Sequence, residues 1–528
     1  MNGQEKGYLA LVLHAHLPFV RHPEYEEFLE ERWFFEALCE TYVPILEMLE
    51  GFQRDNVEYA LTLNISPSLC NMLADELLKG RFLRYLGKMI ELSEKEIDRT
   101  RFSPDFNNLA LMYYHRFSRT RDKFSNNYGQ DLLKEFKRHQ DKGGLEIITC
   151  GATHGFLPLM VNKESIRAQV KVGADSYRKF FGANPKGIWL PECAYYEDVD
   201  RYIKEEGIKY FLTESHGVVF ARPRPKYGVY SSYYTKNRVA VFARDMESSK
   251  SVWSSVEGYP GDYNYREYYR DIGFDLDYDY IKPYISTCGT RIFTGIKYYR
   301  ITGTTPQKEP YNQQWAMDKA ADHAGNFMFN REKQIEHLSG MMDRKPIIVA
   351  PYDAELYGHW WFEGVAWLNF LTRKMCYDQN TVKLITPSRY LGLYPRNQVV
   401  QPAPSSWGWK GYYEVWLNGS NDWIYPHLHR AQEQMHLCAQ KYGGDGAVKD
   451  RVLTQMAREL LLAQSSDWAF MMKTGAFAEY GAKRTVTHLE RFHLLRTYLD
   501  KGFYNMEVIE DIERKDNIFP ELSYSVYK

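Results

Sequence analysis

YLALVLHAH, residues 8–16, is a run of apolar residues that ends in two histidines. The apolar residues are consecutive and do not alternate with polar ones, which is typical of a strand covered on both faces of a parallel sheet. Similar runs follow along the chain: EYALTLNIS (58–66), LEIITCGATH (145–154), GIWLPEC (187–193), YFLTES (210–215), VAVFARD (239–245), PIIVAPYDAE (346–355) and VKLIT (382–386). We expect each of these runs to form a strand.

Helical patterns lie between the apolar runs, for example ERWFFEALCETYVPILEMLEGF (31–52) and KESIRAQVKVGADSYRKFF (163–181). Strands that alternate with helices predict βαβ units with right-handed crossovers, and seven or eight such units close a barrel. The expected fold class is therefore α/β.

Ionisable side chains gather where several of these runs end. They are His14, His16, His154, Glu192 and Asp353. In barrel enzymes the carboxyl ends of different strands converge on one mouth, so residues far apart in sequence share one pocket. This pattern favours a barrel over an open sheet.

Two regions depart from the barrel pattern. Between about 216 and 290 the chain is rich in Tyr, Pro and Gly, and long irregular insertions of this kind are usually functional. After QPAPSS (401–406) the pattern changes to long helices. We expect a catalytic barrel over 1–400 with an insertion at about 216–290, followed by a helical domain over 401–528.

Composition excludes several classes of protein. With 67 Lys+Arg against 68 Asp+Glu, the formal net charge of -1 argues against a nucleic-acid partner. The seven cysteines have no CxxC spacing, which indicates a reducing compartment. No apolar stretch approaches the roughly 18 residues that cross a bilayer, and the N-terminal run suits a buried strand better than a signal peptide. We expect a cytoplasmic protein with no membrane partner, as a monomer or small homo-oligomer.

Glu192 in WLPEC and Asp353 in PYDAE each end a predicted strand. Glycoside chemistry needs two carboxyl groups across the scissile bond, about 5–5.5 Å apart in retaining enzymes and further apart in inverting ones. The structural alternative is a carboxylate that caps the next helix or pairs with an arginine. The chain lacks a Walker loop, a GxGxxG motif after a strand and a GxSxG elbow, which disfavours phosphoryl transfer, dinucleotide redox chemistry and serine hydrolysis.

His14 and His16 fall on one side of the first predicted strand, facing the mouth. Together with His154 and Asp353 they are compatible with a zinc site, and equally with hydrogen bonding to sugar hydroxyl groups. Asp467 in QSSDW is expected to be a helix-end or turn residue unless the helical region reaches the mouth.

Aromatic residues make up 16% of the chain. Aromatic faces suit stacking against sugar rings, although a large aromatic core explains the same excess. The tryptophans that we single out are Trp253, Trp360, Trp361, Trp407, Trp416 and Trp423. The last three lie near Asn418, Asn421 and Asp422 in a glycine-rich segment that resembles a carbohydrate-binding surface.

Five short motifs, in order, give the chain its resemblance to glycoside hydrolase family 57 and, within it, to the branching-enzyme group. They are HAHLP (14–18), LEIITCGATHGFLP (145–158), GIWLPECAY (187–195), APYDAELYGHWW (350–361) and EVWLNGSNDWIYPHLHRAQEQM (414–435). The resemblance covers nearly the whole chain. It implies a distorted seven-stranded barrel, a helical C-terminal domain that closes the cleft, and a retaining mechanism on α-1,4-glucans without a metal or other cofactor.

The resemblance also implies residue roles. Glu192 matches the family nucleophile and Asp353 the family general acid/base. The substrate-binding residues implied, in addition to Trp253 and Trp360, are His14, His16 and His154 at the cleavage subsite, Trp407 and Trp416 for the acceptor, and Asp467 from the helical domain.

The chain departs from the branching group in one loop. Branching members that transfer well carry a mobile loop with a tyrosine at its tip, whereas the connection here is the short YSSYYTKNRV (230–239), in which Tyr233 or Tyr234 is the candidate. A short loop leaves the glycosyl-enzyme open to water. A branching enzyme is thus the leading hypothesis, and an α-amylase or 4-α-glucanotransferase is the alternative. A metal-dependent hydrolase and a catalytically silent glycogen-binding protein are more distant alternatives.

Overall fold

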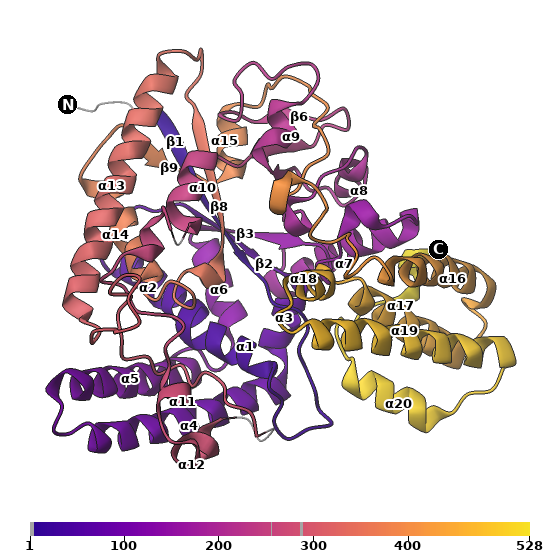
Figure 1. Cartoon of the computed structure of the whole chain (residues 1–528). Helices are drawn as coiled ribbons and strands as arrows, with labels where there is room; N and C mark the ends of the chain where they lie inside the picture. Colours follow the sequence, from indigo (N-terminus) through magenta and orange to yellow (C-terminus); the bar gives the residue numbers. More distant parts are fainter. Residues whose placement is uncertain (1–4, 255, 286–288) are drawn as a thin grey trace.

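The computed structural model describes residues 5–254, 256–285 and 289–528. Its core is a sheet in which seven strands run parallel in the order β7, β5, β4, β3, β2, β1, β8 (Figure 1). Their bounds are β7 (Ala240–Ala243), β5 (Tyr210–Thr213), β4 (Gly187–Trp189), β3 (Leu145–Cys150), β2 (Leu61–Ile65), β1 (Gly7–Ala15) and β8 (Ile347–Asp353). Every run of apolar residues that the sequence marked as a strand contains one.

Two short strands complete the sheet. β6 (Tyr233–Tyr234) pairs antiparallel with β7, and β9 (Val382–Leu384) pairs parallel with β1. β7 and β8 are connected by a backbone hydrogen bond of 2.8 Å from Asp245 N–H to the Val349 carbonyl. This contact stands in place of the regular pairing of adjacent strands. The predicted α/β fold with a distorted seven-stranded barrel is confirmed.

Helices surround the sheet and follow its strands in the chain (Figure 1). Those that accompany the barrel are α1 (Glu31–Ala37), α2 (Val43–Arg54), α3 (Pro67–Ala74), α6 (Leu132–Asp141), α7 (Lys163–Phe181), α8 (Val199–Glu205), α9 (Ser215–Val219), α10 (Met246–Trp253), α13 (Gln313–Ser339), α14 (Gly364–Tyr377) and α15 (Pro387–Leu393). Among the helices of the described residues, none combines the length and apolar character that a bilayer crossing requires.

The range 216–290, expected as one insertion, contains β7 and α10 of the barrel. The irregular chain therefore falls into two parts, before β7 and after α10, and residues 255 and 286–288 lie outside the described part. The later part includes α11 (Ile272–Asp275) and α12 (Tyr278–Ile281), and it packs on the hairpin of α4 (Glu76–Arg99) and α5 (Pro104–Asp122). For example, Tyr284 donates a 2.6 Å hydrogen bond to Glu91 of α4.

The C-terminal helices lie beside the barrel mouth, in yellow in Figure 1. They are α16 (Ile424–Tyr442), α17 (Ala447–Ala463), α18 (Ser466–Thr474), α19 (Ala478–Lys501) and α20 (Met506–Lys515). The apolar positions at helical spacing in α17 and α19 are buried, and one hydrophobic cluster joins them to residues of β1 and α2. Residues 401–411 still run along the barrel, where Gln401 pairs with Arg222 and Ser405 with Tyr195.

Gly173 in α7 and Gly87 in α4 offer a matched test of this packing. A Cβ at Gly173 would lie 2.1 Å from the Cys150 carbonyl oxygen of β3, whereas a Cβ at Gly87 meets nothing within 4 Å. We expect Gly173→Ala to lower the free energy of unfolding by about 1–3 kcal/mol through overpacking. Gly87→Ala should raise it by about 0.5–1 kcal/mol, since alanine costs less backbone entropy in a helix. Urea denaturation of both variants checks this, and equal effects would contradict the tight contact of α7 with β3.

Candidate active site

The carboxyl ends of the parallel strands open into a cavity of about 670 Å³. Most residues singled out from the sequence line it: His14, His16, His154, Glu192, Trp253, Asp353, Trp360, Trp407, Trp416 and Asp467. They come from β1 and β8, from segments that follow β1, β3, β4 and β8, from the end of α10, and from chain beyond residue 400. The prediction that distant strand ends share one pocket is therefore confirmed by their positions.

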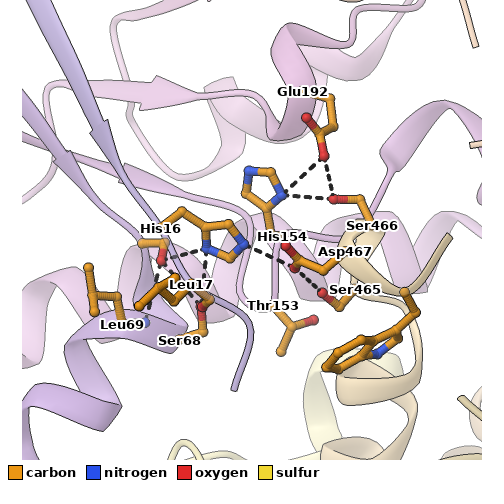
Figure 2. Close-up of polar contacts among 12 residues, drawn as sticks. His16, Leu17, Ser68, Leu69, Thr153, His154, Glu192, Ser465, Ser466 and Asp467 are labelled. Carbon is orange, nitrogen blue, oxygen red and sulfur yellow. Dashed lines mark hydrogen bonds and ion pairs between the residues drawn. The ribbon is translucent and has the colours of Figure 1, made fainter. Parts of the chain in front are cut away.

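Glu192 lies in a tight turn directly after β4. Its φ of 62° and ψ of 23° place it in the left-handed region, which is strained for a residue with a Cβ and is found at functional sites. One carboxylate oxygen accepts a 2.7 Å hydrogen bond from Trp407 Nε1–H. The other accepts a 2.8 Å hydrogen bond from the Ser466 hydroxyl, which Figure 2 shows. Burial raises the pKa of Glu192 to about 6, and these two hydrogen bonds oppose a larger rise.

Asp353 ends β8, beside His14 of β1. Burial, together with the nearby carboxyl groups of Glu355 and Glu192, raises the pKa of Asp353 well above its usual range. With a pKa of about 6, Glu192 is largely ionised at neutral pH, whereas the surroundings of Asp353 favour its protonated form. Two carboxyl groups whose environments separate their pKa values in this way match a nucleophile and a proton donor.

A chain of hydrogen bonds links β2 to Glu192. The Asn64 amide donates to the carbonyls of Ile148 and Thr149, so its oxygen accepts from His14 Nδ1 at 2.6 Å. His14 Nε2 lies 3.0 Å from His154 Nε2, and His154 Nδ1 lies 2.8 Å from the Ser466 hydroxyl. Burial lowers the pKa of both histidines well below the usual range, and the proximity of His16 lowers them further.

His16 behaves differently because it faces Asp467. Its Nε2 lies 3.0 Å from an Asp467 carboxylate oxygen, and its Nδ1 lies 2.8 Å from the Ser66 hydroxyl (Figure 2). Burial alone would lower the pKa of His16, but the Asp467 charge and hydrogen bond raise it above its usual value. Burial likewise opposes the charge of Asp467, yet His16 holds the pKa of that carboxyl below its usual range. Asp467 is therefore part of the cavity and not merely a helix-end residue.

The metal hypothesis rested on His14, His16, His154 and Asp353. Among the described residues that line this cavity, the group whose possible ligand atoms all lie within 4.8 Å of one another is instead His16, His154 and Asp467. Both ring nitrogens of His154 already lie at hydrogen-bond distance from His14 and Ser466. An ion at this place would have to displace one of these contacts before a lone pair of His154 became available.

The tryptophans form the walls of the cavity. Trp407 packs edge-on against Trp189 and Trp253, at centroid distances of 5.0 and 5.8 Å. Trp416 is 1% exposed and stacks on Phe156 at 4.4 Å, so much of this side chain serves packing. Trp361 is 2% exposed and belongs to the core, whereas Trp360 is 51% exposed at the rim.

Tyr234, expected at the site, lies elsewhere. It belongs to β6 and pairs with Ala240, at the start of β7, whereas the cavity opens at the carboxyl ends of the strands. Tyr233 is 1% exposed, and its hydroxyl donates to the Gly228 carbonyl at 2.8 Å. The short connection folds back as a strand on β7, so both tyrosines are structural rather than loop-tip residues.

Sequence reasoning missed several residues of the cavity. Arg244, Glu355, Trp409 and Phe470 line it, and Ser466 contacts Glu192. Burial raises the pKa of Glu355 to about 7, although Tyr42 donates a hydrogen bond to it. Glu355 and Ser466 are each within two residues of a carboxylate that we had singled out, so proximity to Asp353 and Asp467 was the available signal.

Comparison with known proteins agrees with this geometry. Residues 10–402 match the family model described as Glycosyl hydrolase family 57, and residues 427–527 match that of the C-terminal region of 1,4-alpha-glucan branching enzyme. A 1,4-alpha-glucan branching enzyme from Thermococcus kodakarensis is 33% identical over 548 residues, which cover 97% of this chain and 77% of the relative.

Two solved structures are similar over nearly their whole length. The alpha-amylase AmyC from Thermotoga maritima is 44% identical with a TM-score of 0.92, and the match covers 99% of each chain. A branching enzyme from Pyrococcus horikoshii is 34% identical with a TM-score of 0.89, covering 99% of this chain and 97% of that one. The chain therefore belongs to glycosyl hydrolase family 57 and is an enzyme of the glycoside hydrolase and transferase class.

Proposed function

We propose that this chain is a retaining 1,4-α-glucan branching enzyme, in which Glu192 is the nucleophile and Asp353 the general acid/base. The observation that carries the proposal is the pair of buried carboxyl groups in one cavity whose environments separate their pKa values. The proposed substrate is an α-1,4-glucan such as amylose or glycogen, in keeping with the names of the relatives at 33% and 34% identity.

In the proposed reaction the ionised Glu192 attacks the anomeric carbon while Asp353 gives its proton to the leaving glycosidic oxygen. This step breaks the α-1,4 bond and forms a covalent glycosyl-enzyme. Asp353, now ionised, takes the proton of an acceptor hydroxyl, which attacks the anomeric carbon and releases Glu192. A 6-hydroxyl of another glucan as acceptor gives an α-1,6 branch, and water gives hydrolysis.

The surrounding side chains suit sugar binding. His14, His16 and His154 form a stacked group of rings beside Glu192, and Asp467 adds a carboxylate hydrogen-bond acceptor. Trp253, Trp360 and Trp407 supply flat faces for sugar rings, whereas Trp416, which is 1% exposed, contributes packing to the cavity wall. We propose that the histidines and Asp467 bind the sugar at the cleavage point and that the tryptophans hold the chain on either side of it.

An α-amylase is the second candidate. The specific observation in its favour is that Tyr233 and Tyr234 are built into β6 and its hydrogen bonds, away from the cavity. Water then has freer access to the glycosyl-enzyme. The 44% identity to an alpha-amylase agrees with this reading.

Compartment, assembly and domain division remain part of the proposal. A cytoplasmic location is supported by the free cysteines Cys39, Cys70, Cys150, Cys193, Cys376 and Cys438. We further propose a monomer or small homo-oligomer, with a catalytic unit over 1–400 and a helical unit over 401–528.

Incubation of the purified protein with amylose tests the proposed activity. We expect new α-1,6 signals in the proton NMR spectrum that exceed the reducing ends released. A rise of reducing ends without α-1,6 signal would instead identify an α-amylase.

The Glu192→Gln variant should lower either activity by several orders of magnitude because it removes the nucleophile. We expect the purified protein to keep its full activity on amylose after treatment with a chelator. A loss of activity would favour the metal-dependent hydrolase.

Ser466 gives a second test through the pH profile. Activity requires Glu192 to be ionised. The acid limb of the profile of kcat/KM against pH should therefore lie near the Glu192 pKa of about 6. Ser466→Ala removes one hydrogen bond to the charged form, and such bonds are worth roughly 1.5–3 kcal/mol. The pKa of Glu192 should rise, and the acid limb of kcat/KM should move upward by roughly one pH unit or more.

Ser466→Thr is the matched control because it keeps the hydroxyl group, and its acid limb should stay near that of the unmodified chain. An acid limb unchanged in Ser466→Ala, with only kcat lowered, would contradict the assigned hydrogen bond. The alkaline limb, which reports Asp353, should remain in place in both variants.

A further inference from the structure

A second groove lies outside the catalytic cavity, between α5 and the start of α13. Two cavities of about 430 and about 570 Å³ share Asn108, Met112 and Gln313, so they are contiguous. Along α5 the lining extends from Asp105 to Thr120, a length of roughly 22 Å at the rise of an α-helix. A groove of this length accommodates several consecutive hexose rings.

Trp315 on α13 is the main aromatic side chain at one end of the groove. It is 52% exposed, and the Arg300 guanidinium lies 5.9 Å from its ring centroid. Arg300 is itself paired with Glu309 on the groove wall. Trp315 therefore leaves a large indole surface in water beside a polar wall of the groove.

Exposed tryptophans already serve the catalytic cavity. Of those exposed in the described residues, Trp360 and Trp409 line that cavity, Trp315 lines the groove, and Trp423 lines neither. Exposed indoles are thus found mainly where this chain has hollowed surfaces. The same combination of an indole and hydrogen-bonding side chains recurs at Trp315.

The chemistry of the Trp315 end of the groove favours a neutral polar ligand. Its walls carry Asp105, Asn108, Glu309 and Gln313, and Leu109 lies in its lining. Carboxylates at this end disfavour an anionic polymer, while amide and carboxylate groups bind hydroxyl groups well. An indole face matches the apolar C–H face of a pyranose ring.

We propose that the groove of α5 and α13 is a non-catalytic binding site for a second stretch of the α-glucan polymer, with Trp315 as its stacking platform. This inference rests on the proposed substrate class. The farther cavity includes Phe362, which follows Trp360 of the catalytic cavity by two residues. A long glucan held in the groove is thereby kept at high effective concentration near the active site, an advantage that short oligosaccharides lack.

Trp315→Ala tests the site in the full-length protein. Retardation in native gels that contain soluble amylopectin should weaken roughly three- to tenfold, the effect of losing one aromatic contact. KM for amylopectin should rise by a similar factor, while kcat, and both constants for maltoheptaose, should stay unchanged. Trp315→Tyr should restore most of the binding, because it keeps an aromatic face.

Phe329→Ala is the matched control, since Phe329 is 53% exposed on the same helix and lies outside the groove lining. It should bind amylopectin like the unmodified chain. Equal retardation of Trp315→Ala and the unmodified chain would overturn the groove proposal while leaving the proposed activity intact. An unmodified chain that neither acts on amylose nor is retarded by amylopectin would overturn both. Equal weakening in Phe329→Ala would also overturn the assignment to Trp315.

Discussion

Glu192 is a buried carboxyl group, and both hydrogen bonds to its side chain come from beyond residue 400. Burial of a carboxylate without donors favours its neutral form, which is a poor nucleophile. Trp407 and Ser466 oppose this effect and keep the pKa of Glu192 near 6. The barrel therefore supplies the carboxyl group, and the later chain supplies the environment in which it can be ionised. The 3.0 Å bond from Ser466 N–H to the His154 carbonyl fixes that later chain to the barrel mouth.

The rest of the site follows from the need to keep neighbouring ionisable groups in different states. Among the described residues no donor forms a hydrogen bond with the Asp353 carboxyl group, and the adjacent Glu355 and Glu192 favour its protonated form. The charge of Asp467 is matched by His16 at 3.0 Å. The chain thus separates a nucleophile, a proton donor and an ion pair within one cavity, chiefly by the number of donors that each carboxyl group meets.

Much of this arrangement is visible in the sequence because it depends on local patterns. Continuous apolar runs predict the buried parallel strands, and the end of a strand places Glu192, Asp353 and the histidines at one mouth. Ser466 and Glu355 were not predicted, since their roles arise from contacts with Glu192 and Tyr42 that are distant in sequence. Tyr234 was placed in the site from the resemblance to branching members, whose loop carries a tyrosine at its tip, and that resemblance gives no information on β6 folding back along β7. The split of the 216–290 region was within reach of the sequence, because the apolar run at 239–245 already predicted a strand inside it, and the pairing of β7 with β5 shows that this strand belongs to the barrel.

The most direct measurement is to locate the covalent intermediate. The Asp353→Asn variant would be mixed with a maltooligosyl fluoride, whose leaving group needs no acid, and then digested for peptide mass spectrometry. Because the amide of this variant cannot activate an acceptor, the glycosyl-enzyme should accumulate, and the account predicts the sugar on the peptide that contains Glu192. A sugar attached to a peptide that contains Glu355 or Asp467, or release of fluoride by this variant without any adduct, would contradict the account.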